Sequence, residues 1–224
     1  MTRLLACIAA VALMSACGND RGEPSPLAKA VGGFAKATLS RVSGKRAVAA
    51  QPASTGQIPR AEIEKYGIPI LRVIIPARAA DALVTITDTK GDVVTWSTTD
   101  GTTFSLRNGV LIQTRGLGPD LMSASAPTLA QLSQNGATNQ RAYFFLGAED
   151  KSERRDYDCT LTVVGTETIE VFSRSHKTTH VKEECVRAQG KITNDFWLEG
   201  ALVRKSRQWT SPGTGYIDFE KVVD

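Results

Sequence analysis

From residue 68 onward the chain is a succession of β-branched and aromatic segments separated by short turns. Two hairpins stand out in its first part. Residues 82–97 turn at Lys90-Gly91-Asp92, and residues 102–116 turn at Asn108-Gly109, the strongest two-residue hairpin signal in the chain. Crossover helices that could join parallel strands are missing between these segments, which argues against a parallel α/β fold.

The remaining segments continue the same pattern. We expect strands over 68–76, 140–148, 155–175, 180–189, 191–200, 201–211 and 214–223, with the long segment 155–175 turning near Gly165. Strands joined by short turns predict an all-β domain, an antiparallel meander closed into a sandwich or a barrel. Short helices are expected over 26–41, 59–67 and 126–134.

The N-terminus has the pattern of an export signal. Arg3 supplies a positive charge, residues 4–13 are uninterrupted apolar sequence, and Met14-Ser15-Ala16 lead directly to Cys17. The apolar run is too short for a membrane span of roughly 20 residues and suits a signal region of about 7–15. Small residues before a cysteine match the bacterial lipobox, in which Cys17 is diacylated and becomes the first mature residue. The alternative is an ordinary secretory signal followed by a chance cysteine.

The lipobox divides the chain into a lipoprotein signal peptide (1–16), a lipidated tether with a short helix (17–59) and a β domain (60–224). Two or three acyl chains, at about 0.8 kcal/mol per buried methylene, anchor a protein stably in a bilayer. Gly18 stands where an Asp would retain an enterobacterial lipoprotein in the inner membrane, so we expect the periplasmic face of the outer membrane. Loss of residues 1–16 removes one basic residue and lowers the formal charge from +4 to +3, which is too weak to indicate a nucleic-acid partner.

Two cysteines are left for the folded domain. Cys7 leaves with the signal and Cys17 carries the lipid, so Cys159 and Cys185 remain. In an oxidising compartment they indicate one disulfide between neighbouring strands, worth roughly 3–4 kcal/mol of stability; free buried thiols are the alternative. Nothing near His176 and His180 completes a tetrahedral ligand set, so we expect surface histidines, no metal and no other cofactor.

Catalytic motifs are missing from the sequence: it has no Gly-rich phosphate loop, no Gly-x-Ser-x-Gly elbow and no His-Glu-x-x-His. Acid pairs such as Asp156/Asp158 and Glu183/Glu184 could serve a glycosidase, although acids on exposed strands usually serve solvation. Aromatic residues on expected strands could be platforms for sugar rings or sheet packing. They are Trp96, Phe196, Trp197, Trp209 and Tyr216.

Several short motifs occur together in a fixed order. They are Trp96-Ser97, the Asn108-Gly109 hairpin, Gly116-Leu117-Gly118-Pro119-Asp120-Leu121, the pair Phe196-Trp197, and Ser206-Arg207-Gln208. With these motifs behind a lipobox, the chain resembles, over roughly residues 60–222, the YjbF/GfcB family of lipoproteins, which is associated with exopolysaccharide and group 4 capsule production. The residues that carry the resemblance, in structural or binding roles, are Trp96, Asn108, Gly109, Gly116, Leu117, Asp120, Phe196, Trp197, Ser206 and Gln208.

The resemblance implies an all-β domain on the periplasmic face of the outer membrane, working beside an outer-membrane β-barrel protein and a soluble periplasmic export protein. It brings no enzymatic activity. We therefore expect an accessory factor, not an enzyme, in exopolysaccharide or capsule secretion and assembly, with polysaccharide as a further ligand. The alternatives are an enzyme that trims or modifies the polymer and a purely structural envelope lipoprotein. A deep cleft holding two acids would favour the enzyme, and a groove lined by Trp and polar side chains would favour sugar binding.

Overall fold

The computed structural model describes residues 58–146 and 152–224, which form an antiparallel sheet with short helical turns. The predicted signal peptide, nearly all of the predicted tether and the helix expected over 26–41 lie outside these residues. The helical elements are α2 (Arg60–Glu64), the 3₁₀ turn η2 (Pro76–Arg78) and α3 (Leu129–Leu132). The strands are β1 (Ile70–Ile75), β2 (Ala80–Lys90), β3 (Val93–Ser97), β4 (Thr103–Arg107), β5 (Val110–Arg115), β6 (Leu121–Ala124), β7 (Thr138–Leu146), β8 (Ser152–Val171), β9 (Arg174–Arg187), β10 (Gly190–Glu199), β11 (Leu202–Ser211) and β12 (Gly215–Val223).

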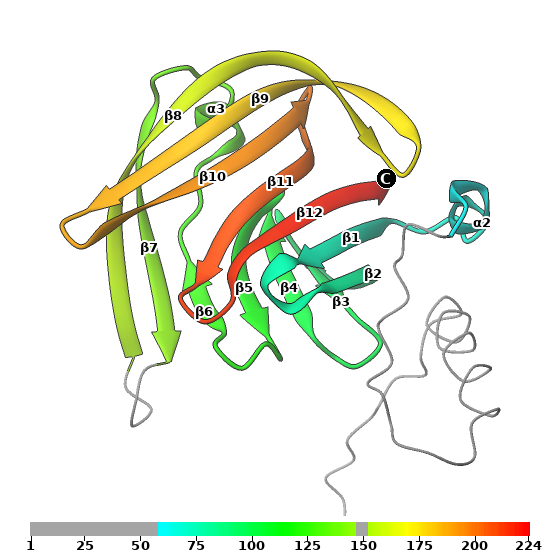
Figure 1. Cartoon of the computed structure of the whole chain (residues 1–224), viewed down its shortest axis with the longest axis horizontal. Helices are drawn as coiled ribbons and strands as arrows, with labels where there is room; N and C mark the ends of the chain where they lie inside the picture. The colour runs from blue at the N-terminus through cyan, green and yellow to red at the C-terminus, as the bar shows by residue number, and fades with distance from the viewer. Residues whose placement is uncertain (1–57, 147–151) are drawn as a thin grey trace, which may run out of the picture. The chain divides into compact units, whose positions relative to one another are not determined.

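The strands follow one another around a single 12-stranded sheet almost in chain order (Figure 1). β2 to β5 extend from one side of β1. β12 pairs with the other side, and the strands from β11 back to β6 continue from there, so β5 and β6 are the two edges. The sheet curls until these edges meet, and the result is a nearly closed barrel. The predicted all-β meander is confirmed, and of the two closures considered the barrel is the one that forms.

Side chains join the two edge strands. The Leu121 amide donates to Thr114 Oγ1 (2.9 Å), and Thr114 Oγ1 donates to Asp120 Oδ1 (2.8 Å). The Arg115 guanidinium donates to the carbonyl oxygens of Leu121 and Met122 (3.2 and 3.3 Å). At this seam, side-chain hydrogen bonds stand in for a backbone ladder and satisfy polar groups that a free edge would leave unpaired.

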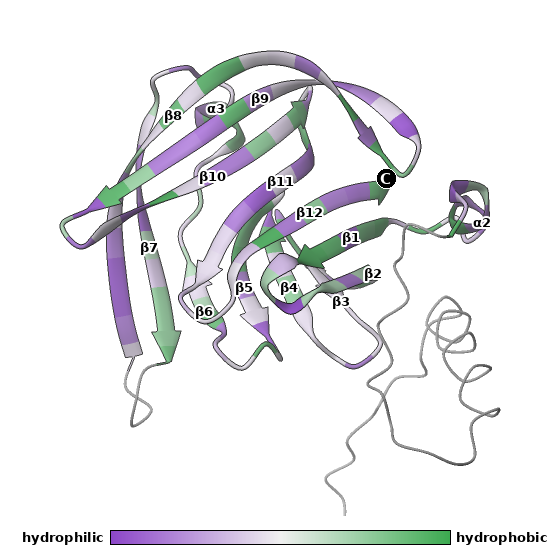
Figure 2. Cartoon of the chain, in the orientation of Figure 1, coloured by the Kyte–Doolittle hydropathy of each residue, from purple (hydrophilic) through white to green (hydrophobic). Residues whose placement is uncertain are grey.

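Alternating residues on the strands build the barrel interior, and the bands of hydrophobic and hydrophilic residues along each strand are visible in Figure 2. The larger apolar cluster includes Trp96, Phe104, Tyr143, Trp209 and Phe219. A smaller cluster brings Leu132 of α3 together with Val110, Phe196 and Val203. α3 therefore contributes to the core even though it is only one turn long.

The two helices expected within the described residues are present and shorter than predicted. α2 follows Pro59, and the chain leaves it at Gly67 with a positive φ of 59°. α3 begins at Thr128, whose side chain forms a reciprocal capping box with Gln131. No helix in the described ranges is long and apolar enough to cross a membrane.

The longest hairpin differs from the prediction. β8 continues past Gly165, which lies where the register with β9 shifts and not at a turn. The chain turns instead at Phe172-Ser173, which both have positive φ (48° and 60°). The prediction of a turn at Gly165 was wrong because glycine is favoured at bulges as well as at turns. The predicted turn at Gly91 between β2 and β3 is confirmed.

A disulfide links β8 to β9. Cys159 and Cys185 are directly opposite each other in the ladder, with 4.0 Å between their Cα atoms, and their sulfurs are bonded. The cross-strand bridge expected from the cysteine count is therefore present. It fixes the register of the longest hairpin from inside the barrel, where both residues are buried.

Candidate functional site

A cavity of about 280 Å³ opens at one end of the barrel, where the β2–β3, β4–β5 and β10–β11 turns come together. Its walls are mostly apolar, and Trp96 and Phe219 connect it to the larger core cluster. We call it the mouth pocket; small-molecule sites often lie in the mouths of β-barrels. Its lining residues include Leu71, Val94, Trp96, Leu106, Asn108, Gly109, Leu202, Val203, Arg204, Ser206, Phe219 and Lys221.

The Asn108-Gly109 turn forms part of the pocket wall. Both residues have positive φ (49° and 84°), as the tight hairpin between β4 and β5 requires. A Cβ on Gly109 would lie only 2.5 Å from Val203 Cβ, so a glycine lets β5 approach β11 closely. Residue 109 therefore needs to be glycine for two reasons, its backbone conformation and the space available.

Gln208 ties this hairpin to β11 across the barrel. Its Oε1 accepts from the Leu111 amide (2.8 Å), while its Nε2 donates to the Gly109 carbonyl (2.9 Å) and to Ser206 Oγ (2.9 Å). β5 and β11 are not neighbours in the sheet. Gln208 thus replaces a missing ladder at the buried start of edge strand β5, and it brings two sequence motifs together that lie about a hundred residues apart.

Charged side chains gather at the rim, and one cation is fully paired. Arg204 holds Asp224 through two hydrogen bonds (2.8 and 3.0 Å) and donates to Glu199 (2.8 Å). Burial alone would lower the pKa of Arg204, but the hydrogen bonds that its guanidinium donates to Asp224 and Glu199 outweigh burial and leave that pKa raised. His176, expected at the surface, is buried because it faces this group, with Nδ1 3.0 Å from Glu199 Oε2.

Lys221 is the second cation at the rim, and its surroundings differ. It follows Ile217 and Phe219 on the inner face of β12 and is opposite Leu71 of β1. It is half-buried, and within the described residues its ammonium has no hydrogen bond and no ion pair. Burial lowers the pKa of Lys221, although the charge of Asp224 partly opposes that shift. An unpaired cation in an apolar pocket is a common feature of binding sites.

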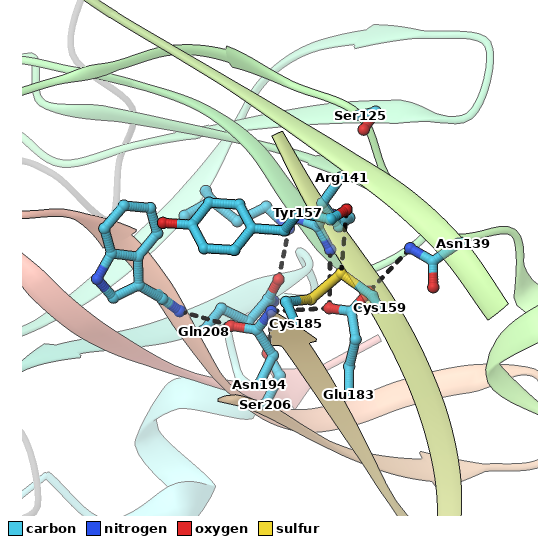
Figure 3. A network of polar contacts seen from close by, with 12 residues as sticks. Ser125, Asn139, Arg141, Tyr157, Cys159, Glu183, Cys185, Asn194, Ser206 and Gln208 are labelled. Atoms are coloured by element: carbon cyan, nitrogen blue, oxygen red, sulfur yellow. Dashed lines mark hydrogen bonds and ion pairs between the residues drawn. A yellow bond between two sulfur atoms is a disulfide. The ribbon is translucent and has the colours of Figure 1, made fainter. Parts of the chain in front are cut away.

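A second group of polar side chains surrounds a buried ion pair (Figure 3). Glu183 and Arg141 form an ion pair (3.1 Å), and their side chains are 0% and 1% exposed. Glu183 also accepts from Asn194 (2.7 Å) and Asn139 (3.1 Å), and Asn194 Oδ1 accepts from the Trp209 amide (2.7 Å). We call these four side chains, Asn139, Arg141, Glu183 and Asn194, the buried network. Tyr143 lies beside this network and is itself fully buried, and its own burial raises the pKa of its hydroxyl to about 12.

The buried network was not predicted from the sequence. Its residues share the inner faces of β7, β9 and β10 with apolar residues two positions away, such as Tyr143, Val181 and Phe196, and that spacing was the available signal. Glu183 also lies near both cysteine sulfurs, with all potential ligand atoms within 4.8 Å. The disulfide takes up both thiolates, so this group does not offer a metal the soft ligands it would need.

Comparison with known proteins identifies the family of this chain and a solved structure with a similar fold. A family model described as group 4 capsule polysaccharide lipoprotein gfcB, YjbF matches residues 42–222. The chain belongs to the YjbF/GfcB family. The fold of this YjbF/GfcB protein is also found in the crystal structure of the hypothetical lipoprotein YmcC from Escherichia coli K12, with a TM-score of 0.67 and 16% identity over 91% of this chain and 98% of that one. No curated protein matches the chain.

The residues that carried the family resemblance come together in two places in this YjbF/GfcB domain. One group lines or supports the mouth pocket: Trp96, Asn108, Gly109, Ser206 and Gln208. The other forms the β5–β6 loop at the seam, where Asp120 accepts from the amides of Gly116 and Leu117 (3.0 and 3.1 Å). Phe196 joins neither group and fills the smaller apolar cluster.

Trp197 lies on the outer face of β10, and side chains from the two neighbouring strands lie against its ring. His180 stacks on the ring, with centroids 4.7 Å apart and an angle of 6° between planes, and Lys205 Nζ lies 5.7 Å from the ring centroid. These partners come from β9 and β11, on opposite sides of β10. Trp197 therefore packs on the outer face of the sheet between His180 and Lys205.

Proposed function

We propose that this YjbF/GfcB protein is a non-catalytic accessory factor in the secretion or assembly of exopolysaccharide or group 4 capsule. Lipid on Cys17 holds it at the periplasmic face of the outer membrane. It acts by binding: to a β-barrel protein of that membrane, to a soluble periplasmic export protein, and to the exported polymer.

The observation that carries this proposal is the family match, because the description of that family names both the lipoprotein and the group 4 capsule. The barrel adds support for binding. Its mouth pocket is built on residues of the family motifs and is held in shape by Gln208, so it is preformed. Preformed pockets lose little conformational entropy when a ligand enters them.

A polymer-modifying enzyme is the competing function. A glycosidase needs two carboxyl groups roughly 5–10 Å apart that both reach the substrate. Glu183, the acid of the buried network, is fully buried and holds hydrogen bonds from Arg141, Asn139 and Asn194. Its charge is paired inside the protein, which supports a structural role over an acid–base role for this residue.

Deletion of the gene tests the proposal in cells. We expect less secreted polymer with an unchanged repeat unit, measured by uronic-acid or hexose assay and by NMR of the purified polymer, and restoration by a plasmid copy. A changed repeat unit or a new substituent would favour the enzyme. Normal amounts of a normal polymer would favour a purely structural lipoprotein.

Binding partners are tested by cross-linking the lipidated protein in intact envelopes. We expect an outer-membrane β-barrel protein and glycan to be recovered with it, identified by mass spectrometry and by sugar analysis. The matched control is the Cys17→Ala chain, which should lose the barrel partner. Equal recovery by both chains would contradict a role for the lipid in placing the protein beside that partner.

A further inference from the structure

The mouth pocket has the chemistry of a site for one class of ligand. Its walls are formed by aliphatic and aromatic side chains, including Leu71, Leu106, Leu202 and Phe219. At about 280 Å³ it is slightly smaller than the roughly 300–1,000 Å³ of typical small-molecule sites. Its size therefore fits a short chain or a single ring and not a folded glycan.

Few polar groups in the pocket are available to a ligand. Ser206 Oγ already accepts from Gln208, and the Arg204 guanidinium is occupied by Glu199, Asp224 and the Lys221 carbonyl. Asp92 pairs with Arg107 (3.3 Å). A saccharide would leave most of its hydroxyl groups without partners against such walls, and each unpaired buried hydroxyl costs binding energy.

Lys221 supplies the charge that the rest of the pocket lacks. Arg204 holds the nearest acid, Asp224, in a two-point contact, and no carboxylate of the described residues lies within ion-pair distance of the Lys221 ammonium. The pocket therefore combines a hydrocarbon wall with one half-buried and unpaired cation. An anion placed against Lys221 would recover the charge pairing that the fold itself does not provide.

We propose that the mouth pocket binds a short amphiphile, with its anionic carboxylate or phosphate head against Lys221 and its hydrocarbon chain along Trp96, Leu106 and Phe219. This inference deepens the proposed function by naming a ligand class for its pocket, and it rests on that function. Leu202 lines the pocket and is half-buried there, so it would contact the chain.

Photo-cross-linking tests the site directly. The lipidated full chain in phosphatidylcholine nanodiscs is exposed to decanoate that carries a diazirine on its chain, and labelled peptides are mapped by mass spectrometry. Unlabelled decanoate and decyl phosphate are added as competitors to compare a carboxylate with a phosphate head group. Decanol tests the hydrocarbon chain without a charge, and inorganic phosphate tests the charge without a chain. We expect label within residues 94–106 and 202–219, and competition by both anionic amphiphiles at concentrations about tenfold or more below decanol.

Separate variants test the contribution of the Lys221 charge and that of the apolar pocket wall to binding. Lys221→Gln should weaken competition by the anionic amphiphiles at least about tenfold and leave decanol unchanged, and Lys221→Arg should restore it. Lys177→Gln, which removes an exposed lysine on β9, is the matched control and should behave as wild type. Leu202→Trp should fill part of the pocket and weaken decanoate and decanol alike. Circular dichroism before labelling identifies any variant that fails to fold, and Lys221→Arg then carries the comparison.

Several results would overturn the inference. They are label outside the pocket, decanol competing as well as decyl phosphate, inorganic phosphate competing alone, or Lys221→Gln behaving as Lys177→Gln does. The proposed function fails in a different measurement, as normal polymer secretion by the deletion strain. The ligand class and the export role can therefore be rejected independently.

Discussion

Arg141 and Glu183 are opposite charges inside the barrel, and neither reaches solvent. Removing two ions from water is costly, and their attraction compensates only when the remaining hydrogen-bonding capacity is also satisfied. Asn139 and Asn194 provide such bonds to Glu183, and Asn194 links the pair to the backbone of β11. At the scale of single residues, the interior is held in one arrangement by polar bonds as well as by apolar packing.

Glu183→Gln should lower the free energy of unfolding by about 3–5 kcal/mol, because it leaves the Arg141 charge buried without a partner. The double change Arg141→Met with Glu183→Leu should recover most of that loss. Urea unfolding followed by circular dichroism measures both. Asp156→Asn, which breaks the exposed pair with Arg154, is the control and should change stability by less than about 1 kcal/mol. Equal losses of unfolding free energy in Glu183→Gln and Asp156→Asn would contradict the conclusion that the buried Arg141 charge needs Glu183 as its partner.

Tyr143 should make the barrel sensitive to alkali. Burial raises the pKa of its hydroxyl to about 12 in the folded state, against about 10 in the unfolded chain. The protonated folded state is therefore favoured below pH 10, and this contribution, about 2–3 kcal/mol, is lost as the pH rises from 10 through 12. Tyr143→Phe should remove that part of the pH dependence in urea titrations at pH 9 to 12. If the free energy of unfolding of Tyr143→Phe falls with pH as steeply as that of the wild type, other groups cause the alkaline sensitivity.

At the scale of elements, the close contact between the β4–β5 hairpin and β11 shapes the mouth pocket. Gly109 meets Val203 at the contact, and Gln208 bonds to the carbonyl of Gly109 and to the amide of Leu111, two residues further along. Hydrogen bonds and packing thus restrain a hairpin whose outer strand is a sheet edge. The pocket should keep its shape only while this contact remains close.

Gly109→Ala should therefore cost more stability than Gly91→Ala. Both glycines have positive φ, which costs a substituted alanine about 1–2 kcal/mol. A Cβ at residue 91 meets open space, while one at 109 also collides with Val203 and should add about 1–3 kcal/mol. A double-mutant cycle with Val203→Ala measures that extra term. A coupling energy near zero would mean that the hairpin moves away without cost.

Turn chemistry explains which elements were predictable. Lys90-Gly91-Asp92 and Asn108-Gly109 identified their hairpins because the residues that permit a tight turn are local in sequence. The Phe172-Ser173 turn has no such signature, and Gly165 drew the prediction to a bulge instead. β6 is four residues long and carries little signal of its own.

The pocket and the buried network could not be predicted from the sequence, because both depend on how distant strands come together in three dimensions. Trp96 and Ser206 were singled out from short motifs, but nothing in the sequence shows that they share a cavity. Arg141 and Glu183 resemble solvent-facing residues in a linear pattern, since charged residues on strands usually face water. Their burial follows from the curl of the sheet, which makes an interior face of positions that alternation alone leaves undecided.

At the scale of the whole molecule, the proposed lipid attachment depends on residue 17, which lies outside the described residues. Cys17→Ala should prevent incorporation of labelled palmitate and leave the chain at the mass of its precursor, because the lipobox cysteine is needed for both acylation and cleavage. Cys7→Ala is the matched control and should be labelled and processed normally, since that residue leaves with the signal. Palmitate incorporation into the Cys17→Ala chain would contradict the anchor.

The pairing of β1 with β12 has a consequence for the order of folding. All other backbone ladders join strands that are consecutive along the chain, so each can form as soon as its second strand is available. β1 must wait for the last strand, and pairing between segments so distant is slow. Until then β1 and β11 each present an open edge to other chains. The interval between synthesis of the first strand and arrival of the last is therefore when this barrel is most exposed to aggregation, and when a chaperone would protect it most.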